Sequence, residues 1–126
     1  MNSQQNQLII QVKNGTKIQL VDAADVIYIE SIGRKAVLHL ANDTIEYYAK
    51  ISGLEMQLGT DFFLIHRAYL INIHYIKSYD KREVQMKNDD LLLISKYRLQ
   101  AFQSKMREYG CTIQKNLQND RRKAKI

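Results

Sequence analysis

The 126-residue chain contains no proline, one cysteine and no long apolar run. Without proline it cannot hold a proline-rich linker. Cys111 has no second cysteine with which to form an internal disulfide, which fits a reducing cytoplasm. Every apolar stretch is far shorter than the ~20 residues of a transmembrane helix, so the sequence predicts no integral membrane protein. The polar start, residues 1–7, lacks the charged and apolar regions of a signal peptide.

The length and the hydrophobic content of 45% are typical of one folded globular domain. We expect a polar N-terminal segment over residues 1–7, a folded domain over residues 8–110 and a basic, flexible tail over residues 111–126.

The net charge of +6 is distributed unevenly along the chain. Residues 1–65 have a net charge of −2, whereas residues 66–110 and the tail each have +4. A folded part with its positive charge in one half predicts a face for an anionic partner such as a nucleic acid.

Apolar alternation and turn residues predict a mostly β domain with roughly eight strands and two short helices. Asn14-Gly15 is typical of a hairpin turn, and Gly59 and Gly110 are placed to end helices over residues 51–59 and about 96–109. Residues 62–72 begin as a core strand and then break at polar groups. The remaining strands are expected at residues 8–12, 16–21, 26–31, 34–40, 44–50, 73–79, 83–86 and 91–95.

The residue types that carry enzyme chemistry do not fall into a catalytic pattern. His39, His66 and His74 have no metal-ligand spacing to one another or to Cys111, and no glycine begins a phosphate-binding loop. We therefore expect no enzyme, no cofactor and no metal site.

Polar and basic residues recur at the ends of the expected strands and at the start of the last helix. Such side chains can donate to guanine, pair with adenine or hold phosphates, so they suggest a DNA-binding surface. The alternative for each is an ordinary solvated loop end, and for Asn72 it is an asparagine that closes a turn. The candidates are Arg34, Lys35, His66, Arg67, Asn72, Lys77, Lys81, Arg82, Lys96 and Arg98.

Three blocks of sequence occur in a distinctive order. They are DAADVIYIES (22–31), FFLIHRAYLIN (62–72) with IK at 76–77, and LLLISKYR (91–98). These blocks resemble the signatures of the LytTR family, the DNA-binding domains usually found at the C-terminus of LytR/AlgR-type bacterial response regulators. The resemblance covers residues 8–109, and its middle block matches the family at Phe62, His66, Arg67, Tyr69 and Asn72.

The resemblance implies an elongated, mostly β fold of small antiparallel sheets with two or so short helices and no helix-turn-helix. Loops would read bases in successive major grooves and bend the DNA, and two domains would often occupy paired direct repeats. By position, the base-contacting residues would be Arg34, Lys35, Asn72, Lys96 and Arg98. Phosphate contacts or loop support would come from His66, Arg67, Lys77, Lys81 and Arg82. Glu30 fits the family's Glu-Ser position, and on physical grounds we expect it to be a structural or orienting carboxylate.

Two departures from the family pattern affect the expected function. Ala68 stands where the family usually has serine, which removes a hydroxyl from the turn. No receiver domain precedes the first block, so we expect either a stand-alone regulator or a piece of a longer protein.

The leading hypothesis is a sequence-specific, double-stranded DNA-binding transcription regulator of the bacterial cytoplasm. It could bind DNA as a homodimer or act with a partner response regulator. The alternative is a module of the same fold that modulates a partner regulator without reading DNA itself. RNA binding is less well supported, because the eight tyrosines are not accompanied by an RNA-binding motif.

Overall fold

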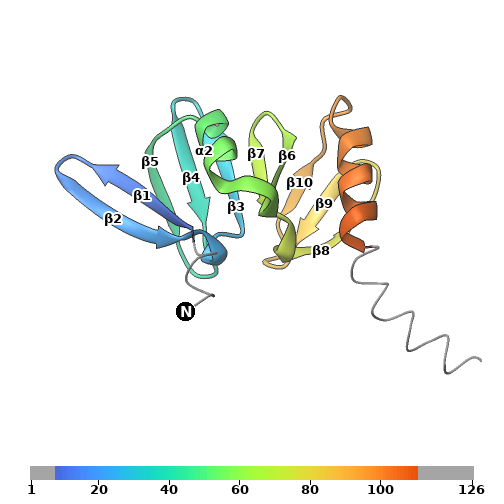
Figure 1. Cartoon of the computed structure of the whole chain (residues 1–126), viewed down its shortest axis with the longest axis horizontal. Coiled ribbons are helices and arrows are strands. Elements are labelled where there is room, and N and C mark those ends of the chain that lie inside the picture. Colours follow the sequence, from blue (N-terminus) through green and yellow to red (C-terminus); the bar gives the residue numbers. More distant parts are fainter. Residues whose placement is uncertain (1–7, 111–126) are drawn as a thin grey trace, which may run out of the picture.

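The computed structural model describes residues 8–110 and arranges them in three antiparallel sheets of two, five and three strands (Figure 1). The expected mostly β fold of small antiparallel sheets with two helices is confirmed. In chain order the strands are β1 (Ile9–Asn14), β2 (Lys17–Asp22), β3 (Tyr28–Ile32), β4 (Lys35–His39), β5 (Thr44–Tyr48), β6 (Phe62–His66), β7 (Tyr69–Asn72), β8 (Ile76–Tyr79), β9 (Glu83–Met86) and β10 (Leu91–Leu93).

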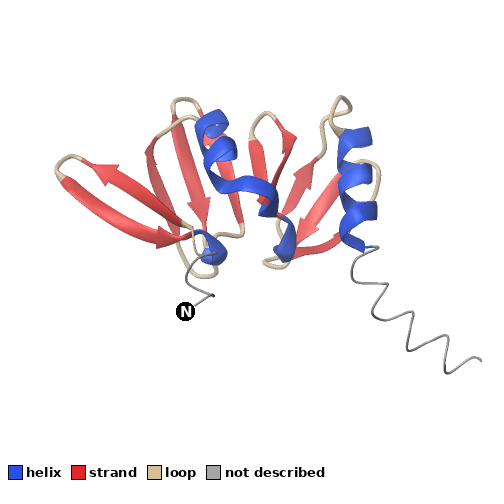
Figure 2. Ribbon diagram, in the orientation of Figure 1, coloured by secondary structure: helices blue, strands red, loops and turns tan. Residues whose placement is uncertain are grey.

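Helical segments connect these sheets, and in Figure 2 helices lie in front of the central sheet and of the three-stranded sheet. Three are single 3-10 turns, η1 (Ala23–Asp25), η2 (Gly59–Asp61) and η3 (Ile73–Tyr75). The α-helix α2 (Ile51–Leu58) ends at Gly59, whose φ of 70° is one that glycine adopts without strain. A second α-helix, called the C-terminal helix below, runs from residue 99 to residue 110. Cys111 and the predicted basic tail lie outside the described residues.

The central sheet has the strand order β5-β4-β3-β7-β6 and is buried on both faces. Ile29 and Leu38 belong to a core shared with α2 and the β1–β2 hairpin. Tyr28 and Ile71 belong to a second core, shared with the three-stranded sheet and the C-terminal helix. Because successive residues of a strand point to opposite faces, a strand buried on both sides reads as an unbroken apolar run. This accounts for the sequence VIYI before Glu30.

The three-stranded sheet, in the order β10-β9-β8, packs beneath the C-terminal helix. Phe102 of that helix is fully buried, with its ring centroid 5.9 Å from Phe63 and 5.2 Å from Tyr79. Burying a phenylalanine of this kind contributes about 1.5–3 kcal/mol to folding. The helix is thereby tied to the central sheet and to the three-stranded sheet.

The prediction of roughly eight strands was too low, because residues 62–72 form a hairpin. Strands β6 and β7 pair with each other, with an irregularity between Leu64 and His66. The strand expected over residues 73–79 begins only at Ile76, since η3 occupies its first three residues. Asn72 caps that turn by accepting a hydrogen bond from the backbone N–H of His74 over 3.0 Å.

Candidate nucleic-acid interface

Three turns lie next to one another along one edge of the molecule, the upper edge in Figure 2. They are the β3–β4 turn (32–35), the β6–β7 turn (66–69) and the loop 94–98. The N–H of Ser31 donates to the carbonyl oxygen of Ala68 over 2.9 Å, which joins the first turn to the second. The N–H of Ser95 donates to the carbonyl oxygen of Ile65 over 2.8 Å, which joins the second to the third. We call this row the turn edge.

The β8–β9 turn extends the turn edge at its far end. The N–H of Ile94 donates to the carbonyl oxygen of Arg82 over 2.8 Å, so residues 80–82 lie beside the loop 94–98. Asp80 shapes this turn, because its Oδ1 accepts from the N–H groups of Arg82 (2.7 Å) and Glu83 (3.0 Å). These two hydrogen bonds lower the pKa of the Asp80 carboxyl, since they stabilise its charged form.

Exposed cations line the turn edge from one end to the other. Arg34, Arg67, Lys96 and the pair Lys81-Arg82 are all exposed. Within residues 8–110, no ion pair is formed by any of them. Arg82 also interacts electrostatically with the Asp80 carboxylate. Cations without an ion pair are available to an anionic partner, and four separate turns of the chain supply them.

The β6–β7 turn is held in shape by His66. Its Nδ1 accepts the backbone N–H of Ala68 over 3.0 Å, and its ring lies 5.3 Å from that of Tyr69. Because the carbonyl oxygen of Ala68 is bonded to Ser31, the backbone of this turn is fixed on both sides. His66 therefore orients the turn from which the Arg67 side chain projects.

Arg98 and Lys35 lie at the turn edge but already have partners in the protein. Arg98 donates from Nε to the carbonyl oxygen of Leu64 over 2.9 Å, and its guanidinium lies 4.9 Å from the ring centroid of Phe63. Lys35 pairs with Glu46 over 3.7 Å and lies 5.4 Å from the ring centroid of Tyr48. Arg98 thus fastens the loop 94–98 onto β6, and Lys35 is partly neutralised.

Asn72, which the family resemblance implies as a base contact, has its side chain inside the protein. Its side chain is 2% exposed, so almost none of it reaches the surface. Its Nδ2 donates to the carbonyl oxygen of Val26 over 3.0 Å, while its Oδ1 accepts from His74. The alternative of an asparagine that closes a turn is the one that this geometry fits.

Lys77 lies away from the turn edge. It is near the start of β8, at the end opposite to the β8–β9 turn, and its Nζ is 2.8 Å from Oδ1 of Asp89. This partner neutralises the ammonium, so the phosphate contact expected for Lys77 has no support in this arrangement.

The architecture of these sheets and turns agrees with a known family. The LytTr DNA-binding domain family matches residues 3–107. The chain belongs to this family. The LytTr DNA-binding domain of a methyl-accepting/DNA response regulator from Bacillus cereus has the same fold, with a TM-score of 0.68 and 18% identity. That match covers 79% of this chain and 96% of the other.

Two curated relatives are similar to this LytTR chain over most of its length. Accessory gene regulator protein A of Staphylococcus epidermidis (strain RP62A) is 32% identical over 94 residues, which cover 71% of this chain and 39% of that protein. Accessory gene regulator protein A of Staphylococcus aureus (strain N315) is 33% identical over 85 residues, which cover 64% and 35%. The chain thus spans less than half the length of these relatives.

Glu30 of the LytTR chain belongs to a polar cluster that joins sheets. Its Oε1 lies 3.0 Å from Nε2 of His39, and the His39 ring stacks on Tyr28 at 4.1 Å. The Tyr28 hydroxyl donates to Asp90 over 2.9 Å, which ties the central sheet to the β9–β10 turn. Burial is the main cause that raises the pKa of Tyr28 strongly, followed by its bond to Asp90. The expectation of a structural carboxylate at Glu30 agrees with these contacts.

Three exposed residues at or beside the turn edge of the LytTR domain were not among the candidates from the sequence. Tyr97 is 87% exposed and lies 5.9 Å from the Lys96 ammonium, and Tyr48 and Lys50 are exposed beside the β3–β4 turn. The position of Tyr97 between two cations was a usable signal. Tyr48 and Lys50 had none, because only the pairing of β4 with β5 brings them near Arg34.

No helix within residues 8–110 is long and apolar enough to cross a bilayer. The same residues contain no group of histidine, cysteine, aspartate and glutamate side chains arranged to hold a metal ion.

Proposed function

We propose that this LytTR domain binds double-stranded DNA sequence-specifically and regulates transcription in the bacterial cytoplasm. The observation that carries the proposal is the turn edge, where cations from four turns lie in a row without ion-pair partners among residues 8–110. Membership of a DNA-binding family and similarity to the accessory gene regulator proteins support it.

The spacing of the turns suits the width of a DNA groove. Neighbouring strands lie ~4.8 Å apart, so the β3–β4 and β6–β7 turns are centred roughly 10 Å from each other. The major groove of B-DNA is about 12 Å wide. Arg34 and Arg67 can therefore address a groove and its flanking phosphates at the same time.

If the β3–β4 turn and the loop 94–98 are both to contact bases, the DNA must bend toward them. The distance from the β3–β4 turn to the loop 94–98 is roughly 15–20 Å by strand spacing. Successive major grooves on one side of a straight duplex lie about 34 Å apart. Contacts by Arg34 and Lys96 in successive grooves therefore require long side chains and a duplex bent toward the turn edge.

We assign base contacts to Arg34 and Lys96, with Tyr97 beside Lys96. Arg67, Lys81 and Arg82 hold phosphates, while His66 and Arg98 support the turns and Lys35 orients the β3–β4 turn. Two domains on paired direct repeats, as a homodimer on DNA or with a partner response regulator, complete the proposal.

Selection of duplexes from a random-sequence library by the purified chain, at two salt concentrations, tests this function. We expect an enriched motif and binding that weakens as salt rises, because phosphate contacts release counterions. Salt-dependent binding without any enriched motif would contradict sequence specificity, and absence of binding at both salt concentrations would contradict the whole proposal.

A module that binds a partner protein is the second candidate, because one face of the β1–β2 hairpin exposes three large apolar side chains. Leu20 is 65% exposed, and Ile9 and Ile18 lie exposed on the same face by the strand register. This candidate predicts binding to a full-length regulator with no salt-dependent affinity for DNA. Replacing Leu20 by lysine should abolish that binding while leaving DNA binding unchanged.

A further inference from the structure

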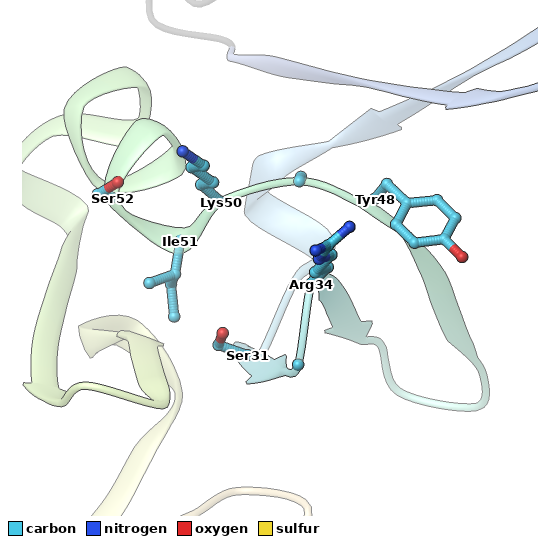
Figure 3. A pocket seen from close by; sticks show the side chains of 8 residues that line it. Ser31, Arg34, Tyr48, Lys50, Ile51 and Ser52 are labelled. Atoms are coloured by element: carbon cyan, nitrogen blue, oxygen red, sulfur yellow. The ribbon is translucent and has the colours of Figure 1, made fainter.

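A hollow of about 720 Å³ lies beside the β3–β4 turn, between that turn and the start of α2 (Figure 3). Three separate parts of the chain enclose it: the β3–β4 turn, the end of β5 and the first turn of α2. The residues that carry the argument are Ser31, Arg34, Tyr48, Lys50, Ile51 and Ser52.

The polar lining of the hollow is suited to an anion. Arg34 and Lys50 supply two positive charges, and Ser31 and Ser52 supply hydroxyl groups. The hollow has no carboxylate among its lining residues, and within residues 8–110 neither cation forms an ion pair. The first turn of α2 contains no acidic residue, so no carboxylate there offsets the charge of Lys50.

The rest of the lining is apolar. Ile51 lies across the hollow from Arg34, and the ring of Tyr48 stands at the outer rim, 73% exposed (Figure 3). A bare phosphate ion would leave these surfaces uncovered. A phosphate attached to a sugar would cover them, because deoxyribose presents carbon atoms beside its phosphodiester.

We propose that this hollow holds one phosphodiester of the DNA backbone with its deoxyribose. Lys50 and Ser52 donate to the phosphate, Tyr48 and Ile51 contact the sugar, and Arg34 reaches past them to a base. The inference rests on the DNA binding proposed above and extends the contact surface from the turn edge onto α2.

The test compares Lys50→Gln with the wild-type chain on the enriched duplex and on an unrelated duplex of equal length. Each phosphate neutralised contributes about 0.9 to the slope of log K against log salt concentration. We expect Lys50→Gln to reduce the magnitude of that slope by about 0.9. Between 50 and 200 mM salt, the wild-type chain should therefore lose roughly threefold more affinity than the variant. Both duplexes should be affected alike, because a phosphate contact carries no sequence information.

Two further variants separate the parts of the site. Tyr48→Leu should weaken binding by the same factor at both salt concentrations, since it alters the sugar contact and no charge. Lys13→Gln makes the same charge change at an exposed residue of β1 and should leave the slope unchanged. Thermal unfolding of each variant checks that the fold is retained.

The outcomes distinguish this inference from the function on which it rests. Wild-type binding that depends on salt, with an unchanged slope in Lys50→Gln, overturns the inference alone. If the wild-type chain does not bind DNA, both the inference and the proposed function are overturned. Titration of inorganic phosphate, followed through the amide signals of Ile51 and Ser52, identifies the source of the anion. Saturable binding of phosphate that matches the affinity for DNA would assign the hollow to a free anion and overturn the DNA assignment.

Discussion

The side-chain amide of Asn72 donates to the backbone carbonyl oxygen of Val26 over 3.0 Å, from the end of β7 to the residues that precede β3. The backbone N–H of Asn72 also donates to the carbonyl oxygen of Ile27 over 3.1 Å. One residue thus uses its main chain and its side chain to hold two strands in register. Asn72, although it lies in a block of the DNA-binding family, therefore has a structural role in this fold.

Asn72→Ala should therefore lower stability and leave sequence preference unchanged. The change removes the cap of η3 and leaves the buried Val26 carbonyl unpaired, which together cost about 2–4 kcal/mol. Chemical denaturation measures this loss, and the exposed Asn42→Ala is the matched control, expected within about 0.5 kcal/mol of wild type. Normal stability with an altered binding motif would restore the base-reading role.

Arg34→Ala should flatten the preference at one position of the binding motif. A well-placed arginine–base contact provides about 1–3 kcal/mol of discrimination. Arg34→Lys is the informative partner variant, because it keeps the charge and loses the two-pronged geometry of the guanidinium. Competition with singly substituted duplexes measures the effect. Equal weakening on every duplex, with the motif intact, would make Arg34 a phosphate contact.

Arg82→Gln and Lys77→Gln should differ, although each removes one positive charge from the same sheet. Arg82 lies at the turn edge, whereas Lys77 is paired with Asp89 at the opposite end. We expect the salt slope of DNA binding to fall by about one in Arg82→Gln. It should stay at the wild-type value in Lys77→Gln, and an equal fall in both variants would place the DNA elsewhere on the sheet.

Tyr28→Phe should change how stability depends on alkaline pH. The pKa of Tyr28 is raised in the folded chain, so its stabilising effect is complete below the unfolded pKa of about 10 and is lost as pH rises above it. The wild-type unfolding free energy should fall by about 1.4 kcal/mol per pH unit from this group in that range. The variant should lack this slope and be about 1–3 kcal/mol less stable at neutral pH, since it loses the bond to Asp90.

Tyr47 is the internal control for this measurement. Burial raises its pKa too, but it has no hydrogen bond of the kind that Tyr28 makes to Asp90 among the contacts of residues 8–110. Tyr47→Phe should reduce the alkaline slope without the loss at neutral pH. If Tyr28→Phe titrated like wild type, the Tyr28 hydroxyl would be ionising in the folded chain.

The elements that the sequence predicts well are those whose local chemistry decides their shape. The hairpin expected at Asn14-Gly15 forms, although its two turn residues are Gly15, at a φ of 63°, and Thr16, because Asn14 ends β1 and pairs with Lys17. The helix α2 ends at the expected glycine. Membership of the LytTR family was likewise readable from the three blocks, because those blocks contain core strands and turns together.

The site was less predictable, because a side chain's partner is a property of the tertiary structure. Lys77 and Arg82 are both basic residues near the end of an expected strand, so the sequence does not distinguish their roles. Only the strand order places Asp89 beside Lys77. Asn72 looked exposed because a polar residue interrupted an apolar run. Its side chain instead hydrogen-bonds a buried carbonyl oxygen and caps a turn. That carbonyl belongs to Val26, 46 residues away, which no local sequence pattern identifies as the partner.

Main-chain hydrogen bonds join the turns of the turn edge to one another, as the bonds from Ser31 to Ala68 and from Ile94 to Arg82 illustrate. Their spacing consequently does not depend on the exposed side chains of Arg34 and Lys96. Under the proposed function, a substitution at Arg34 or Lys96 should alter the preferred DNA sequence while the distance between these two reading positions stays constant. The proposed function therefore predicts that single replacements change the target, without redesign of the backbone.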